Sequence, residues 1–291
     1  MAAVCGAVSL GPSESGDLRL AAARSDLEGN EWLGEVQLCT ASAAEGLTVV
    51  NRKRMRSGVT CVASVTGAVA SAGSSFVAVG CDSGDAFLVR LPHTAEAESA
   101  AATHEEDDVE FDYGADAADV MGCHDNVVSC VAAMAGGSVI LGGEAGASAW
   151  DPRAGPDTTG RLSAAVGVTA AAACGEWVTA LGFAHGAVGA VDARAVGRGM
   201  LLWAPHSHRG EVRSLAYAAT ASPGSAALVS GGECGVVRVS TFESDATAGA
   251  ISGATVSAPT ARKEAVAAVG FSSGSTGAWS VTQDGAFALL D

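Results

Sequence analysis

A repeated pattern of strand, glycine turn and strand is the feature that most constrains the fold of this 291-residue chain. Each copy has an apolar run, then a tight turn with an acidic or polar residue two positions before a glycine, then a second apolar run. The clear copies are GCDSGDAFLVRL (80–91), GGEAGASAWD (142–151), GFAHGAVGAVD (182–192), GGECGVVRVS (231–240) and TQDGAFALLD (282–291). Their turn glycines are Gly84, Gly146, Gly186, Gly235 and Gly285, and Gly34 in WLGEVQL (32–38) marks a weaker first copy. Glycine suits such a turn because this hairpin geometry needs a positive φ.

A second strand precedes most of these turns and completes a larger unit. It occurs in SGVTCVASV (57–65), HDNVVSCVAAM (124–134), VGVTAAAAC (166–174), HRGEVRSLAY (208–217) and KEAVAAVGF (263–271). Successive turn glycines are 50, 62, 40, 49 and 50 residues apart. Two strands, a glycine turn and a third strand at this period describe one blade of a β-propeller. The sequence therefore predicts an all-β propeller that forms one domain over residues 1–291, with six detectable blades.

The ends of the chain and one long connection bear on the number of blades. A seventh blade would have to lie between Pro92 and Cys123, an acidic stretch without a glycine turn. The last copy ends at Leu290-Asp291, directly after its third strand. We therefore expect VCGAVSL (4–10) to supply the outer strand of the last blade, because such closure removes a free sheet edge.

Two further features resemble WD-repeat proteins over nearly the whole chain. His124 and His208 stand where that family places the histidine of a Gly-His dipeptide, and Trp150-Asp151 matches its Trp-Asp dipeptide. Members of the family hydrogen-bond a buried His, Ser or Thr, Asp and Trp within a blade. The third copy here has Gly142 and Glu144 where Ser and Asp are usual, so we expect this buried set to be incomplete.

The composition limits the partners that the protein can have. The chain is 48% hydrophobic and 16% charged, with a formal net charge of −16, which repels nucleic-acid phosphates and favours basic polypeptides. Neither a membrane span nor a basic signal segment is recognisable. The eight cysteines are scattered singly within apolar runs, which is typical of reduced, buried thiols in a cytoplasmic or nuclear protein.

Motifs for catalysis and metal binding are weak. Asp82-Ser83-Gly84 has the Asp-Ser-Gly order found around the nucleophile of trypsin-like proteases, but it falls on a turn of the repeat, where other copies have Ala, His or Cys in place of the serine. We therefore interpret it as a turn. His206 and His208 form a close pair, but no cysteine or carboxylate stands beside them at ligand spacing. The sequence predicts neither an enzyme nor a bound cofactor or metal.

An acidic segment at about 93–122 is the most charged part of the chain. HEEDDVEFDYGADAAD (104–119) holds eight carboxylates and three bulky apolar or aromatic residues. One interpretation is a solvated loop, and the other is a docking surface for Arg-rich tails, on which aromatic rings could stack against guanidinium groups. The residues that would form this surface are Glu105, Glu106, Asp107, Asp108, Glu110, Phe111 and Asp112.

The only basic cluster is NRKRMR (51–56). A linker between strands is one interpretation of this stretch, and a nuclear-import signal is the alternative.

Trp32 stands in a polar setting, DLEGNEWLGEV (26–36), in a chain with only 5% aromatic residues. If Gly34 is the turn glycine of the first copy, Trp32 precedes the turn, whereas Trp150 follows its own turn. Two roles stay open: Trp32 packs between the first two blades, or it is an exposed anchor for another protein.

The surrounding stretch DLRLAAARSDLEGNEWLGEVQL (17–38) resembles the first blade of the methylosome WD-repeat family, the partner of the type II protein arginine methyltransferase. That family presents its tryptophan on a projecting hairpin with the pattern Leu-x-Gly-x-x-Trp-x-Gly, which here is Leu27, Gly29, Trp32 and Gly34. VGCDSG (79–84) with LVRL (88–91), and HDNVVS (124–129), resemble the second and third blades. The resemblance implies that Trp32 inserts into a pocket on the N-terminal barrel of the methyltransferase.

The resemblance also implies a function: a non-catalytic scaffold of the methyltransferase complex, in the cytoplasm and nucleus. Such a scaffold would present histone tails or Sm-type spliceosomal proteins to the enzyme through an acidic surface. The alternative is another WD-repeat interaction module, such as a nucleoporin-type protein or a ubiquitin-ligase substrate receptor, with Trp32 buried.

Overall fold

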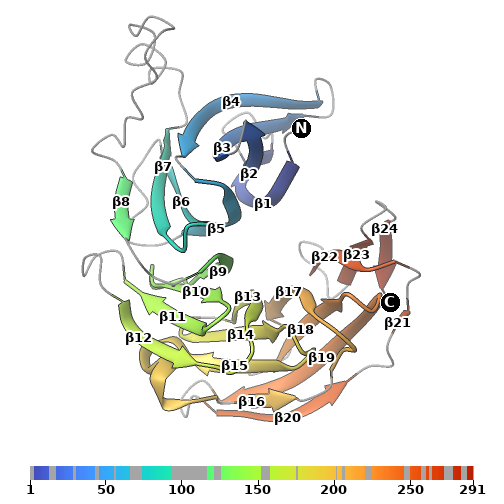
Figure 1. Cartoon of the computed structure of the whole chain (residues 1–291). Coiled ribbons are helices and arrows are strands. Elements are labelled where there is room, and N and C mark those ends of the chain that lie inside the picture. The colour runs from blue at the N-terminus through green and yellow to red at the C-terminus, as the bar shows by residue number, and fades with distance from the viewer. Residues whose placement is uncertain are drawn as a thin grey trace, which may run out of the picture. The chain divides into compact units, whose positions relative to one another are not determined.

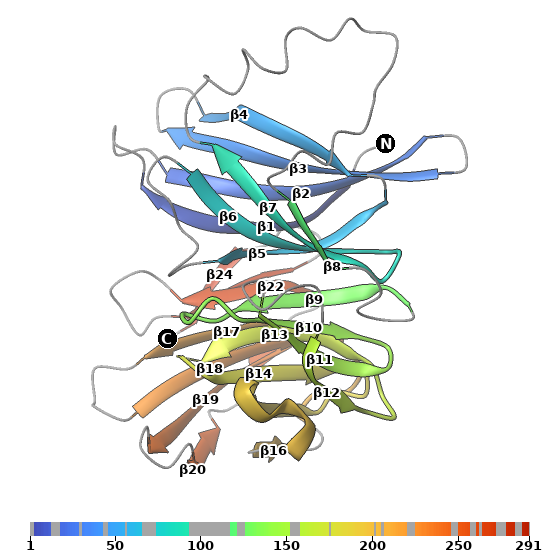
Figure 2. The ribbon, with the colours of Figure 1, turned by 90° about the vertical axis from the view of Figure 1, so that its left-hand side faces the viewer.

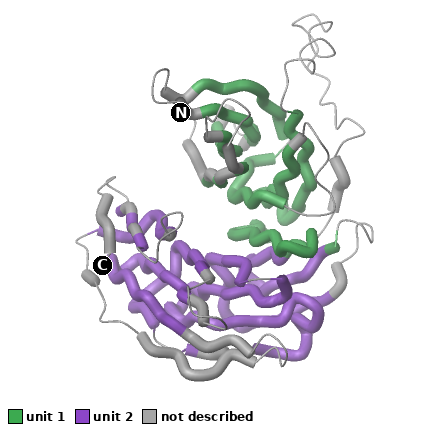
Figure 3. The backbone as a smooth tube through the Cα atoms, turned by 180° about the vertical axis from the view of Figure 1, so that it is seen from behind, with its two compact units in different colours: residues 1–139, 151–157 green, residues 140–150, 158–291 purple. Residues whose placement is uncertain are grey.

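Nearly all of the protein that the computed structural model describes lies in β-strands (Figure 1). The described residues are 3–12, 18–28, 31–42, 46–55, 57–65, 74–92, 117–120, 126–151, 158–174, 176–200, 202–204, 207–219, 225–245, 250–256, 260–261, 264–271, 278–282 and 287–290. The chain divides into two compact units, which comprise Met1–Val139 with Asp151–Asp157, and Ile140–Trp150 with Thr158–Asp291 (Figure 3).

The first unit contains two antiparallel four-stranded sheets. The first sheet has the order β1-β2-β3-β4, and Figure 2 shows its strands side by side, with β4 at one edge. Its strands are β1 (Ala3–Pro12), β2 (Leu18–Glu28), β3 (Glu31–Ser42) and β4 (Gly46–Met55). The second sheet has the order β5-β6-β7-β8 and consists of β5 (Val59–Val65), β6 (Ser74–Cys81), β7 (Ala86–Pro92) and β8 (Ala117–Val120).

The next sheet has the order β12-β11-β10-β9, and the division between the two units falls within it. Its strands are β9 (Val128–Ala133), β10 (Val139–Gly143), β11 (Gly146–Trp150) and β12 (Thr158–Ser163). The sheet β13-β14-β15-β16 follows, with β13 (Val168–Cys174), β14 (Val178–Phe183), β15 (Val188–Asp192), the 3-10 helix η2 (Ala193–Arg198) and β16 (Leu202–Ala204).

Two more sheets complete the second unit. The first has the order β17-β18-β19-β20, with the short β21 also paired to β19. Its strands are β17 (Val212–Ala219), β18 (Ser225–Gly232), β19 (Val236–Asp245), β20 (Ala250–Val256) and β21 (Thr260–Ala261). The last sheet, β22-β23-β24, consists of β22 (Val266–Phe271), β23 (Ala278–Thr282) and β24 (Phe287–Leu290).

The core of the first unit lies between its two sheets. Val36 and Leu38 of β3 pack with Val77 and Val79 of β6, and all four side chains are buried. Ala21 and Ala23 of β2 belong to the same cluster. Burying each valine or leucine contributes about 1.5–3 kcal/mol relative to leaving it exposed. The period of two along these strands therefore fixes which face of the first sheet meets the second sheet.

A contact between a glycine and a valine recurs at several places where one sheet packs on the next. A Cβ atom on Gly80 would lie 2.5 Å from Cγ1 of Val128, the first residue of β9. The same contact joins Gly182 to Val212 at 2.5 Å and Gly231 to Val266 at 2.4 Å. Since real Cβ atoms do not approach a neighbour so closely, glycine at these positions lets adjacent sheets come together.

A threonine hydroxyl links the sheets at two of these contacts. The Oγ1 atom of Thr169 lies 2.7 Å from the carbonyl oxygen of Val212 and 3.4 Å from that of Gly182. Thr60 stands in the same relation to Val128 and Gly80. Because a hydroxyl has one proton, it donates to one of the two carbonyl oxygens at a time. At these two places a threonine hydrogen bond, which we call the polar lock, joins neighbouring sheets beside the glycine–valine contact.

The structure confirms most of the repeat that the sequence predicts. The five upstream runs form β5, β9, β13, β17 and β22. The turn glycines Gly84, Gly146, Gly186 and Gly235 have φ angles of 86°, 123°, 88° and 72°, as the turn requires. Gly285 lies outside the described residues. The six sheets in the described part of the chain match the six detectable blades.

Two expectations are wrong. Residues 4–10 do not complete the last blade: they lie in β1, which pairs with β2, because the alternating apolar residues Val8 and Leu10 pack against the core of the first unit. Gly34 is not a turn glycine. It lies inside β3, where it pairs with Ser25 on one side and Met55 on the other.

Candidate partner-binding site

The β2–β3 hairpin of the first blade carries the predicted anchor. Its ladder runs without a register shift from Leu18 opposite Ala41 to Glu28 opposite Glu31, and Trp32 lies opposite Leu27. Gly29 and Asn30, which join the two strands in the sequence, lie outside the described residues. The side chains of Leu27 and Trp32 are also outside the description, so only the backbone of these two residues is placed.

This hairpin is longer than the corresponding hairpins of three other blades. Val59, the first residue of β5 in the second blade, contacts the paired residues Ser25 and Gly34 of the first blade. This contact is the reference point from which the length of the hairpin is measured. Eight residues (26–33) connect that pair. Five residues connect the equivalent pairs in other blades: 81–85, 183–187 and 232–236.

The additional residues continue the β-ladder. Three more pairs form beyond Ser25 and Gly34, namely Asp26 with Leu33, Leu27 with Trp32, and Glu28 with Glu31. At about 3.3 Å per residue, the hairpin extends about 10 Å past the level at which the first blade meets the second. Trp32 stands on this extension, two residues beyond Gly34.

Gly34 and Ser25 hold the base of the extension. A Cβ atom on Gly34 would lie 2.5 Å from the carbonyl oxygen of Ser57 and 2.5 Å from Cγ2 of Val59. The hydroxyl of Ser25 is buried and donates to the carbonyl oxygen of Val59 at 2.7 Å. Gly34 is buried as well, so its contribution to a binding site is to let the hairpin pack on β5. Sequence reasoning missed Ser25, although it interrupts the alternating alanines Ala21 and Ala23.

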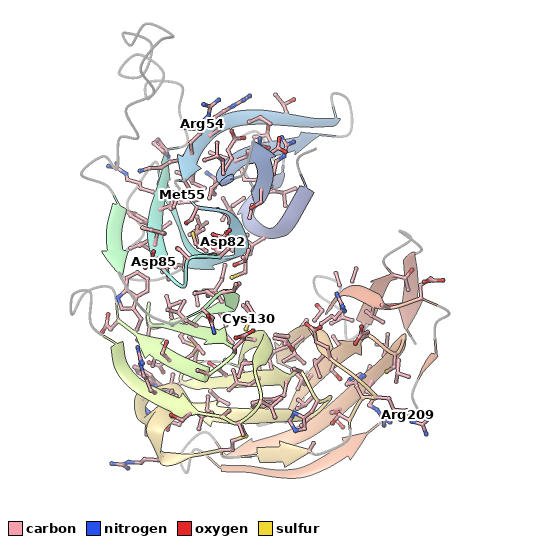
Figure 4. All side chains as sticks on the ribbon, viewed as in Figure 1. Arg54, Met55, Asp82, Asp85, Cys130 and Arg209 are labelled. Atoms are coloured by element: carbon pink, nitrogen blue, oxygen red, sulfur yellow. The ribbon has the colours of Figure 1, made fainter. Side chains whose placement is uncertain are left out.

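The basic cluster 51–56 is not a linker, because all but its last residue lies in β4. β4 pairs with β3, so that Arg54 lies opposite Glu35 and Arg52 opposite Gln37. Met55 is buried in the core, whereas Arg52 and Arg54 are exposed; Figure 4 labels Arg54 and Met55 at this end of the strand. Backbone pairing with β3 and the burial of Met55 keep this segment in the sheet despite its three consecutive cations. Arg56 lies outside the described residues.

The Asp-Ser-Gly motif forms the β6–β7 turn, as its position in the repeat predicts. The backbone N–H of Cys81 donates to the carbonyl oxygen of Asp85 at 3.0 Å, which closes the turn. Ser83 is exposed, and its hydroxyl donates to Oδ2 of Asp85 at 2.8 Å. Burial raises the pKa of the Asp82 carboxyl, opposed by backbone N–H groups that donate to it. Figure 4 labels Asp82 and Asp85 in this turn.

His208 belongs to a buried polar pair of the kind expected from the WD-repeat resemblance. Its Nε2 lies 2.8 Å from Oγ of Ser230, and both side chains are buried. Burial, with a smaller contribution from the positive charge of Arg238, lowers the pKa of His208 to about 4. The imidazole is therefore neutral near pH 7. His124 and His206 lie outside the described residues.

The cysteines and the acidic residues support no metal centre in the described part of the chain, where no three potential ligands cluster. Six cysteines whose side chains the structure describes are free thiols: Cys39, Cys61, Cys81, Cys130, Cys174 and Cys234. Desolvation raises the pKa of Cys81 and of Cys174 to about 12, so both stay protonated near neutral pH.

The acidic segment at about 93–122 is only partly within the described residues. Glu105, Glu106, Asp107, Asp108, Glu110, Phe111 and Asp112 all lie outside the described residues. Residues 117–120, at the end of the predicted acidic loop, form β8 and pair with β7.

Comparison with known proteins decides the fold. A scan against protein-family models and a search of the curated proteins give no match. The structure is similar to that of Sqt1 from Chaetomium thermophilum, with a TM-score of 0.63 and 14% identity over 99% of this chain and 69% of that one. Sqt1 is a WD40 propeller protein. The fold is a WD-repeat β-propeller.

Two further solved structures agree with this propeller fold. Sqt1 from Saccharomyces cerevisiae matches with a TM-score of 0.59 and 11% identity over 98% of this chain and 70% of that one. A chain of the Mitotic Checkpoint Complex matches with a TM-score of 0.57 and 16% identity over 88% of this chain and 69% of that one. Among the residues that the structure describes, no helix has the length and apolar character needed to cross a lipid bilayer.

Proposed function

We propose that this propeller is a non-catalytic scaffold of a protein arginine methyltransferase complex and that its β2–β3 hairpin is the arm that binds the methyltransferase. The observation that carries the proposal is the length of this hairpin, whose ladder continues three pairs past the level of Val59. Trp32 stands on these three pairs. The WD-repeat propeller fold suits a platform for protein–protein interaction.

A tryptophan on a rigid extension makes an effective anchor. Moving an indole of roughly 200 Å² from water into a partner's pocket contributes about 5 kcal/mol before the costs of association. Truncation of such an anchor to alanine typically weakens binding by about 2–4 kcal/mol. The buried base formed by Ser25 and Gly34 fixes the extension before binding, which lowers the entropy lost on association.

A pull-down with the type II protein arginine methyltransferase tests this role. We expect Trp32→Ala to lose most of the captured enzyme while its thermal unfolding stays close to that of the wild type. Trp177→Ala is the matched control, because Trp177 is a half-buried tryptophan in the second unit. Equal capture by wild type and Trp32→Ala, with a loss of stability in the variant, would instead show a buried tryptophan and favour a WD-repeat module for another partner.

We further propose that the acidic segment recruits basic substrates such as histone tails or Sm-type proteins. Residues 104–119 hold eight carboxylates, whereas the whole chain has 16 Lys and Arg residues. The acidic segment is therefore a strong local source of negative potential. Neutralising Glu105, Glu106, Asp107 and Asp108 as amides should weaken the binding of Arg-rich peptides. The effect should be largest near 10 mM salt, where the Debye length is about 30 Å, and fade near 1 M. Unchanged peptide affinity at low salt would contradict this role.

A further inference from the structure

β4 is an edge strand whose outer edge is open among the described residues, since the sheet order β1-β2-β3-β4 ends with it. It is ten residues long, whereas a typical strand has about five or six. Every second residue of such a strand points its backbone N–H and C=O groups away from its partner strand. An edge of this length is a template on which another extended segment can pair.

The charge along this edge is positive in a strongly acidic protein. Arg52 and Arg54 are exposed and two residues apart, so both lie on one face of the sheet. No hydrogen bond or ion pair joins either side chain to another described residue. Their cross-strand neighbours do not compensate them, because Gln37 Nε2 donates to Oε1 of Glu35, and Arg24 lies opposite Glu35 on β2. Arg24, Arg52 and Arg54 share this face with Glu35 and, two residues along β2 from Arg24, with Asp26.

The same strand carries exposed apolar surface next to these cations. Val49 is 38% exposed and is one of two large hydrophobic residues that are exposed in the described part of the chain. Thr48 beside it is exposed as well. Residues 48–54 thus combine an open backbone edge, a small apolar contact and two unpaired guanidinium groups over seven positions.

We propose that the open edge of β4 binds an extended acidic peptide of a partner protein as an additional strand. Carboxylates at alternate positions of the incoming strand would be spaced like Arg52 and Arg54, about 7 Å apart. A second copy of this chain does not fit, because pairing two β4 edges would bring two sets of cations onto one short ladder. This edge is distinct from the β2–β3 hairpin and does not depend on the proposed methyltransferase complex.

Charge complementarity favours an acidic peptide over nucleic acid. The formal net charge of −16 repels a polyphosphate along its length, whereas a short peptide meets only the local cations. Moreover, only a polypeptide can continue the backbone hydrogen bonds of the ladder.

Titration of the full chain with the labelled peptide Thr-Glu-Thr-Glu-Val-Thr-Val at low salt tests this proposal. We expect the double variant Arg52→Glu/Arg54→Glu to bind at least tenfold more weakly, and Arg52→Gln/Arg54→Gln to lie between it and the wild type. Arg198→Glu/Arg209→Glu is the control with the same charge change at two exposed arginines of the second unit, and it should bind within twofold of the wild type. A peptide N-methylated at alternate amides should bind at least tenfold more weakly than its parent.

Four results would overturn the proposal. The first is equal binding by the wild type and the glutamate variant when thermal unfolding shows both folded, and the second is equal binding of the N-methylated peptide. The third is displacement of the peptide by an oligothymidine at a lower concentration than by unlabelled peptide, which would identify a nucleic-acid site. The fourth is binding that occurs only after Glu105, Glu106, Asp107 and Asp108 are neutralised, which would make the chain's own acidic segment the occupant.

Discussion

Gly34 illustrates at the residue scale how one amino acid can serve two purposes in the same repeat. At Gly84 and Gly186 the missing Cβ permits a positive φ. At Gly34 it permits the backbone of Ser57 to approach to a distance that a side chain would block. A glycine before an apolar run therefore signals either a turn or a close contact, and sequence alone does not separate them.

His208 makes the stability of the protein depend on pH. Its pKa is about 4 in the folded chain and about 6.5 in an unfolded chain. Between these values the unfolded chain binds more protons, so the contribution of His208 is fully present above pH 6.5 and is lost as the pH falls toward 4. After allowance for solvent screening, this loss is on the order of 2 kcal/mol.

Urea unfolding between pH 7 and pH 4 measures this loss. We expect His208→Gln to be less stable than the wild type at pH 7 but to have a shallower decline of the unfolding free energy with falling pH. His185→Gln, at an exposed site, should keep the wild-type decline. Parallel declines in the wild type and His208→Gln would contradict the assignment.

At the scale of elements, the recurring contact between neighbouring sheets carries much of the fold. Thr169 places a hydroxyl 2.7 Å from the carbonyl oxygen of Val212, and Thr169→Val removes this donor while keeping the β-branched shape. We expect a loss of about 1–2 kcal/mol of unfolding free energy, because the carbonyl loses its partner. Thr48→Val, at an exposed position of β4, should change the unfolding free energy by less than about 0.5 kcal/mol. Equal effects of the two substitutions in denaturant titrations would argue against the lock.

The elements also show what could be predicted from the sequence. The turns at Gly84, Gly146, Gly186 and Gly235 and the strands before them were predictable, because turn chemistry and period-two alternation are local properties. The length of the β2–β3 hairpin was not, since it is measured against Val59, which is 25 residues beyond Gly34 in the chain. The basic run 52–54 resembled a linker because pairing with β3 is invisible in the sequence.

At the scale of the whole molecule, the chain combines an acidic balance with one basic strand. The net charge of −16 attracts basic polypeptides over long distances, whereas Arg52 and Arg54 on β4 act only on groups nearby. Within this WD-repeat propeller, the β2–β3 hairpin is longer than three other hairpins of the chain, and β4 carries exposed arginines.

Amide hydrogen exchange of the full chain, alone and with the type II protein arginine methyltransferase, tests the central role of the hairpin most directly. We expect the amides of residues 27–33 to become protected in the complex, while the shorter turns at 82–85 and 233–236 exchange as they do in the free protein. Unchanged exchange of residues 27–33 in a complex that demonstrably forms would contradict this role.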